Sequence, residues 1–121
     1  MQNKEGIKNS QLNIGIIGLG LIGGSLAKAI SDLGVHVVRG FDINQDVLNA
    51  AQSDGSICGE LTRDCISECD ILFVALTPHN ALDFLNKNAE KLNNLVVDCC
   101  GVKRLVFDTY MNASQLYDFL Y

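Results

Sequence analysis

The sequence lacks an excess of basic residues, and this absence excludes whole classes of partner. Nine Lys and Arg residues stand against fourteen Asp and Glu residues, so the net charge is −5. Nucleic acids and anionic membrane surfaces are bound largely through positive charge. We therefore expect neither nucleic acid nor membrane among the partners. A single anionic ligand stays compatible with this charge, because local backbone dipoles can hold one.

Long apolar runs are also missing. Residues 1–10 are polar and contain no apolar segment of the kind found in signal peptides. The longest apolar stretches, such as 71–76, are far too short to cross a bilayer. We therefore expect a soluble, cytoplasmic protein. Its 121 residues allow one domain, 11–121, preceded by a polar lead over 1–10 that could be disordered.

Cysteine is present, but not in a pattern that indicates chemistry. The count of five is odd, and no Cys-x-x-Cys spacing of the kind used by zinc sites occurs. We therefore expect reduced thiols, no metal, and small buried apolar side chains instead of redox groups. The five residues are Cys58, Cys65, Cys69, Cys99 and Cys100.

Apolar spacing predicts strands and helices in alternation. Strands are expected at 12–17, 36–41, 56–59, 71–76 and 95–98, with a last strand at 116–121. The first helix should bury Ile22, Leu26, Ala29, Ile30 and Leu33 and stop at Gly34. The second should be capped by Asn44, bury Val47, Leu48 and Ala51, and stop at Gly55. A short helix or turn at 62–67 follows. The next helix should start at Thr77-Pro78 with a stripe of Ala81, Leu85, Ala89 and Leu92, and one more should present Val102, Leu105, Val106 and Tyr110.

The first strand runs into a glycine-rich segment, Gly18-Leu19-Gly20-Leu21-Ile22-Gly23. In a strand–loop–helix setting, its first glycine makes the turn, its second admits a pyrophosphate, and its third lets the helix pack closely. The N–H groups at the helix start, including those of Leu21 and Ile22, then face the phosphates. The sequence therefore predicts an α/β fold of the Rossmann type, a doubly wound and mainly parallel sheet, that binds a dinucleotide.

Asp42 ends the second expected strand, 19 residues after Gly23. A carboxylate there can accept both ribose hydroxyls of the adenosine and would repel the 2′-phosphate of NADP. Neither Ile43 nor Asn44 is basic, and Arg39 lies within the strand. The sequence thus favours NAD over NADP, with a helix-capping or solvated Asp42 as the alternative.

The carboxyl ends of the later strands should line the same crevice. This places Leu76, Thr77 and Pro78 near the cofactor, and also Cys99, Cys100 and Gly101. His79 and Lys103, in the first turns of two helices, are either ligand contacts or exposed side chains. His36, at the opposite edge, is expected to be structural.

Four segments together resemble the prephenate dehydrogenases of tyrosine biosynthesis. Residues 16–27, with Gly23-Gly24-Ser25, look like that family's opening; 40–42 look like its ribose-binding strand end, and 75–78 like its fourth-strand exit. Residues 98–103 look like its Asp-x-x-Ser-Val-Lys segment. The resemblance runs from about Leu12 to the C-terminus, and it implies oxidative decarboxylation of prephenate with hydride transfer to NAD or NADP.

Two departures from that family bear on activity. Gly101 stands where the resemblance implies a serine hydroxyl beside the nicotinamide. The sequence also ends at Tyr121, before the segment in which the family has its catalytic histidine and before its helical dimerisation domain. We therefore assign no catalytic residue and expect no turnover from this chain alone. The apolar tail suggests a shortened chain, self-association or a partner chain.

Three alternatives to such a shortened enzyme stay open from the sequence. The chain could be a stand-alone NAD-binding or sensor module. It could be a domain of another β-hydroxyacid or imine-type dehydrogenase, or a domain that has lost its ligand.

Overall fold

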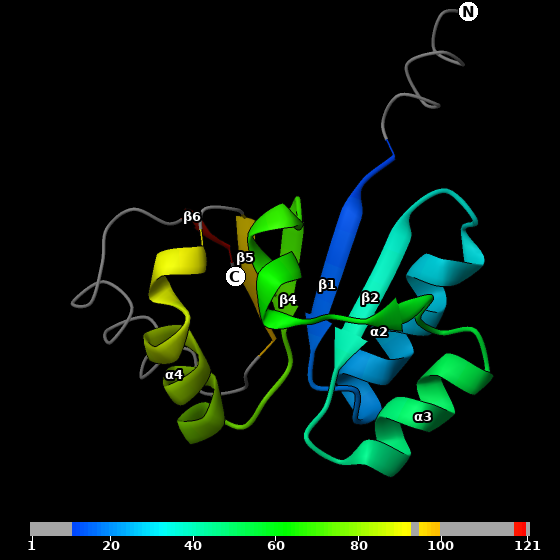
Figure 1. Ribbon diagram of the computed structural model, residues 1–121, viewed down its shortest axis with the longest axis horizontal. Helices are drawn as coiled ribbons and strands as arrows, with labels where there is room; N and C mark the ends of the chain where they lie inside the picture. Colours follow the sequence, from blue (N-terminus) through cyan, green and yellow to red (C-terminus); the bar gives the residue numbers. More distant parts are fainter. Residues whose placement is uncertain (1–10, 93–94, 100–117, 121) are drawn as a thin grey trace, which may run out of the picture.

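The computed structural model describes residues 11–92, 95–99 and 118–120. Six parallel strands form one sheet in the order β3-β2-β1-β4-β5-β6 (Figure 1). The strands are β1 (Asn13–Ile17), β2 (Val37–Phe41), β3 (Gly59–Glu60), β4 (Ile71–Val74), β5 (Leu95–Asp98) and β6 (Asp118–Leu120). The helices are α2 (Leu21–Asp32), α3 (Gln45–Ser53) and α4 (Pro78–Lys87), with 3-10 turns η1 (Arg63–Glu68) and η2 (Ala89–Lys91). This order confirms the predicted Rossmann-type α/β fold.

Two apolar clusters cover the two faces of the sheet. Side chains of a parallel strand alternate between faces, so neighbours on β1 belong to different clusters: Ile16 to one and Ile17 to the other. One cluster, on the side of α2 and α3, contains Ile14, Ile16, Leu19, Ala27, Val38, Leu48, Ala51 and Ile57. The other, on the side of η1 and α4, contains Ile17, Leu61, Ile66, Cys69, Leu72, Val74, Ala81, Leu85, Leu92 and Val96.

Helix α2 buries only part of the predicted stripe. Its buried residues are Gly23 and Ala27, whereas Ile22 is 59% exposed and Leu33 is 65% exposed. The reason is the close approach at Gly23, where an added Cβ would lie 1.7 Å from the Gly18 oxygen. The helix therefore rests on its two small residues. The predicted Leu26 and Ile30 are partly buried against the same cluster, whereas Ile22 and Leu33 turn outward.

The remaining element predictions hold with local shifts. Asn44 caps α3 by accepting the N–H groups of Asp46 and Val47. The third strand starts at Gly59 instead of residue 56, because Asp54 Oδ1 accepts both the N–H and the hydroxyl of Ser56 and holds a turn there. The short helix or turn predicted at 62–67 is observed as η1.

The end of α4 also differs from its prediction. Pro78 is the first helical residue as expected, but the hydroxyl of Thr77 makes no capping hydrogen bond. The helix ends at Lys87, so that Ala89 lies in η2 and the expected stripe is interrupted there. The strand predicted at 116–121 is observed over Asp118–Leu120, beside β5. The polar lead over 1–10 and the helix expected after Gly101 lie outside the described residues.

The cysteines are buried only in part, which corrects the prediction. Cys69 is buried, whereas Cys58 is exposed and Cys65 and Cys99 are half-buried. Cys58 is exposed because it precedes the short edge strand β3, while Cys69 packs against β1 at Gly15. Cys100 lies outside the described residues. Within residues 11–92, 95–99 and 118–120, no group of three His, Cys, Asp or Glu side chains could hold a metal, and no helix is apolar and long enough to span a membrane.

Truncation of a central core side chain should be costly. Leu72 is fully buried in β4, so Leu72→Ala should lower the free energy of unfolding by about 2–5 kcal/mol. Urea unfolding measures the change. Leu33→Ala is the matched control, because Leu33 is mostly exposed and should change stability by less than about 0.5 kcal/mol. Equal losses in the two variants would contradict the assignment of the core.

Alkaline pH should reveal the burial of Cys69. Burial, together with the nearby Cys65, raises the pKa of the Cys69 thiol from 9.0 to about 11. The folded state therefore keeps a proton that the unfolded chain loses, so its stabilising effect is complete below about pH 9 and is lost as the pH rises through about 11. The free energy of unfolding, measured from about pH 8 to about pH 10.5, should fall more steeply for the wild type than for Cys69→Ala. Cys58→Ala, at an exposed thiol, should keep the wild-type slope.

Candidate dinucleotide site

The candidate site lies where the connections of the sheet change direction. From β1 the chain moves outward to β2 and β3, and then returns to place β4 on the other side of β1. The loops that leave the carboxyl ends of β1 and β4 therefore diverge, and a crevice opens between them. The glycine loop after β1 forms its centre.

Two glycines of the loop are required by the protein itself. Gly18 has a φ of +94°, and a Cβ there would lie 2.3 Å from the Ala75 oxygen, after β4. A Cβ added at Gly23 would lie still closer to the Gly18 oxygen. Backbone is the neighbour in both cases and cannot move aside as a side-chain tip could. The turn is fixed further by the Gly18 N–H, which donates to the Phe41 oxygen at 2.8 Å.

No packing contact of the protein requires glycine at position 20. It is exposed, and a Cβ added there would meet no atom within 4 Å. It is also the N-cap of α2, where no side chain caps the helix. The first backbone hydrogen bond of that turn joins the Gly24 N–H to the Gly20 oxygen at 2.8 Å, so the N–H groups before Gly24 precede the helical ladder. This open, positively polarised helix start fits a pyrophosphate.

Asp42 connects the loop to the next helix. Its Oδ2 accepts the N–H of Leu19 at 2.9 Å, and its Oδ1 accepts the N–H of Asn44 at 2.9 Å. Each carboxylate oxygen accepts more than one hydrogen bond, so both retain capacity for ribose hydroxyls. The predicted ribose residue is thus also a brace of the phosphate loop, which sequence spacing did not reveal.

Leu19 anchors the loop in the core. The side chain is only 5% exposed and packs in the cluster beneath α2 and α3. It lies against Gly40 of β2, where an added Cβ would be 3.0 Å from the tips of Leu19 and Ile57. The loop is therefore held from inside by Leu19 and from the side by Asp42. The apolar residue between two glycines was the available signal for this anchor.

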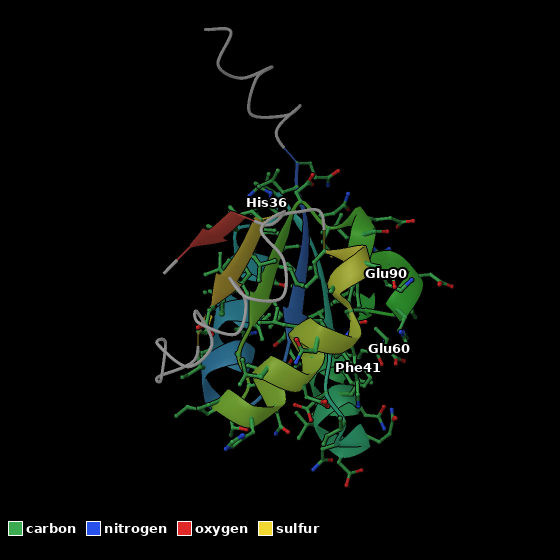
Figure 2. The ribbon with its side chains drawn as sticks, turned by 90° about the vertical axis from the view of Figure 1, so that its left-hand side faces the viewer. His36, Phe41, Glu60 and Glu90 are labelled. Carbon is green, nitrogen blue, oxygen red and sulfur yellow. The ribbon has the colours of Figure 1, made fainter. Side chains whose placement is uncertain are left out.

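A cleft of about 580 Å³ extends from the loop along the face that α4 covers. Its lining includes three positions discussed above or predicted from sequence, Gly18, Asp42 and Leu76. Phe41 and Glu60, labelled in Figure 2, lie near each other on its wall. Sequence reasoning missed the residues that α4 and the start of η1 contribute, because only the folded chain brings them to β2: Arg63, Asn80, Asp83, Phe84, Lys87 and Asn88.

The charges that α4 contributes to the cleft are partly neutralised. Lys87 Nζ lies 3.0 Å from Asp83 Oδ2, one helical turn away, and both side chains are largely exposed. Such a pair is worth little in stability. Arg63 is exposed at the start of η1. The cleft thus combines acidic groups, Asp42 among them, with basic groups and an apolar lining.

The other predicted residues occupy the rim or lie elsewhere. Leu21 is 88% exposed at the start of α2, and Ile43, after Asp42, is 90% exposed. Ile22 joins them, so three large apolar side chains surround the loop. Thr77 and Pro78 follow Leu76 at the start of α4 and lie outside the cleft lining. Gly101 and Lys103 are outside the described residues.

Neither histidine lies in the cleft. His79 is exposed in the first turn of α4. His36 lies at the opposite end of the sheet from Phe41 (Figure 2), where its Nδ1 accepts the N–H of Leu12 at 3.1 Å. This contact agrees with the structural role expected for His36. The described residues therefore offer a place for a dinucleotide without a histidine beside it.

Comparison with known proteins supports this assignment. The family described as "NADP oxidoreductase coenzyme F420-dependent" matches residues 13–101. No curated protein sequence matches the chain. Among solved structures, 3-hydroxyisobutyrate dehydrogenase from Mycobacterium tuberculosis superposes with a TM-score of 0.72 at 18% identity, over 90% of this chain and 39% of that one.

Two further structures contain bound dinucleotides. Prephenate dehydrogenase from A. aeolicus, with hydroxyphenyl propionate and NAD+, gives a TM-score of 0.67 at 25% identity, over 89% of this chain and 40% of that one. Pyrroline carboxylate reductase from Plasmodium falciparum, with NADP, gives 0.62 at 20% identity, over 78% and 36%. The chain therefore spans about two fifths of the length of these dehydrogenases.

Gly20→Ala separates the needs of the ligand from those of the fold. The added methyl group meets no protein atom, and alanine is a poorer N-cap than glycine, so the free energy of unfolding should fall by no more than about 1 kcal/mol. The same methyl group would occupy the space of a pyrophosphate, so calorimetric affinity for NAD should fall at least about tenfold. Gly59→Ala is the matched control, because that glycine also has open space around its Cβ but lies in β3. Unchanged NAD affinity in Gly20→Ala would refute the assigned phosphate loop.

Proposed function

This chain belongs to the NADP oxidoreductase, coenzyme F420-dependent family and is an NAD(P)-binding oxidoreductase-type domain, and from that premise we propose that it binds NAD as the cofactor-holding part of a dehydrogenase. The observation that supports this most directly is that Gly20 has open space around it, whereas Gly18 and Gly23 are closely packed. Gly18 and Gly23 are explained by the packing of the protein, whereas the open space at Gly20 is explained by a ligand. A pyrophosphate at the start of α2 is the ligand that suits this space.

Asp42 supports NAD in preference to NADP. A 2′-phosphate on the ribose would meet the negative charge of Asp42, whereas the free hydroxyls of NAD can donate to it. The family's description mentions NADP, and the solved relatives include both an NAD+ complex and an NADP complex. The basic residue Arg63 lines the same cleft. We weigh Asp42 more heavily because its carboxylate is already oriented by two hydrogen bonds.

Among dehydrogenases, we propose the prephenate type. The support is the motif with Gly24-Ser25 and the 25% identity to prephenate dehydrogenase. A domain of another dehydrogenase is supported equally by structure, since 3-hydroxyisobutyrate dehydrogenase and a Streptomyces aurantiacus imine reductase superpose with TM-scores of 0.72 and 0.68. Those two likenesses, at 18% and 16% identity, concern the fold alone.

A bound nicotinamide would accept or supply hydride, while the protein residues described above would hold and orient it. The start of α2 would bind the pyrophosphate, and Asp42 would fix the adenosine ribose. We propose that substrate binding and proton transfer need groups beyond the described residues, so the chain alone is expected not to turn over. The exposed rim of Leu21, Ile22 and Ile43 is where a second copy or a partner would cover the site.

Calorimetric titration with NAD and then NADP tests the proposal. Wild type should bind NAD at least about tenfold more tightly than NADP, because Asp42 repels the 2′-phosphate. In Asp42→Asn this ratio should fall toward one. The ratio is the informative quantity, since loss of the brace to Leu19 would weaken both ligands together.

Asp46→Asn is the matched control. It removes the same charge four residues away, from an exposed position in the first turn of α3, and should keep the wild-type ratio. Absence of binding of both dinucleotides would refute the proposed function. Equal binding of the two by wild type would remove the role of Asp42 and leave dinucleotide binding intact.

A further inference from the structure

The cleft extends beyond Asp42, where the ribose is expected to bind. Helix α4 begins at the crevice and runs back along the sheet, and the same face of it presents Asn80, Phe84 and Asn88 at successive turns to the cleft. Asn88 is the C-cap of this helix, two turns beyond Asn80. Asp42 and Asn88 therefore mark the polar ends of one continuous space.

Asn88 has a buried oxygen that the protein does not satisfy. The residue is 8% exposed, and its Nδ2 donates to the Phe84 oxygen at 2.9 Å. Its Oδ1 is closed off from solvent and has no hydrogen-bond partner. Most buried polar atoms are paired, so an unpaired acceptor at a ligand cleft calls for a donor. Because Nδ2 donates to Phe84, the oxygen is the atom of the amide that is left without a partner.

The interior of the cleft suits a flat aromatic base. Phe41, Leu76 and Phe84 line it between the two polar ends. With the ribose on Asp42, the attached base would enter this apolar part. Adenine carries one exocyclic amino group, which is a hydrogen-bond donor. The χ2 torsion of an asparagine is soft, so a small turn of the amide is enough to offer Oδ1 to that group.

We propose that Asn88 is a specificity-determining residue whose Oδ1 accepts a hydrogen bond from the 6-amino group of adenine. This rests on the proposed function, because it assumes a dinucleotide in the cleft. A base with a carbonyl oxygen at position 6 would set two acceptors against each other. The cleft would then select adenine by chemistry as well as by shape.

Nicotinamide hypoxanthine dinucleotide is the probe, because it differs from NAD in the adenine base alone, which has a carbonyl in place of the 6-amino group and a proton on N1. Calorimetry on the full 121-residue chain should show NAD binding about tenfold more tightly than the hypoxanthine analogue. In Asn88→Leu, which keeps the branching at Cγ without polar atoms, the ratio should fall to about one. Asn88→Ala provides a second variant in case the larger side chain disturbs α4.

Asn86→Ala is the control. Asn86 is exposed on the same helix, outside the cleft lining, and this variant should keep the wild-type ratio. Equal binding of the two dinucleotides by wild type overturns the proposal, and so does a wild-type ratio that persists in both Asn88 variants. If neither dinucleotide binds, the proposed function fails and this inference fails with it. Binding of both without discrimination removes the role of Asn88 alone.

Discussion

The contact of backbone with backbone at Gly18 and Gly23 is the constraint on which the rest of the site depends. A Cβ at either position would overlap a carbonyl oxygen, of Ala75 in one case and of Gly18 in the other. Because no side chain intervenes, α2 starts directly at the edge of β1. Its N–H groups are thereby brought to the crevice between the diverging loops. A helix held one side chain further away would leave those groups over the surface of the sheet.

Asp42 and Leu19 keep that arrangement in place without a ligand. The carboxylate accepts one N–H group from the loop after β1 and another from the N-cap of α3, and the Leu19 side chain fills a space that Gly40 leaves in β2. A loop already held in its binding geometry loses little conformational freedom when a ligand arrives. The site is thus organised by the core of the domain, while α4 and η1 form the cleft beside it.

The fold and the loop could be predicted from sequence because their determinants are local. A strand, three spaced glycines, a helix and an acid at the next strand end occur in order along the chain, and each has a specific backbone requirement. The stripe of α2 was predicted only in part, because the close packing of Gly23 turns Ile22 and Leu33 outward while Leu26 and Ile30 still pack against the core. The cleft residues Arg63, Phe84 and Asn88 could not be predicted, since they come together only through the crossovers from β3 to β4 and from β4 to β5. The brace from Asp42 to Leu19 depends in the same way on the pairing of β1 with β2.

The unequal surroundings of the three glycines have a consequence for descent. A relative that lost its ligand over evolutionary time would still need Gly18 and Gly23 to fold, so selection would retain both. Position 20, which meets no protein atom, would be released from selection and would accumulate side chains. Gly18 and Gly23 therefore reflect the fold of a lineage, and only Gly20 reflects continued binding of its ligand. Here that position is still glycine.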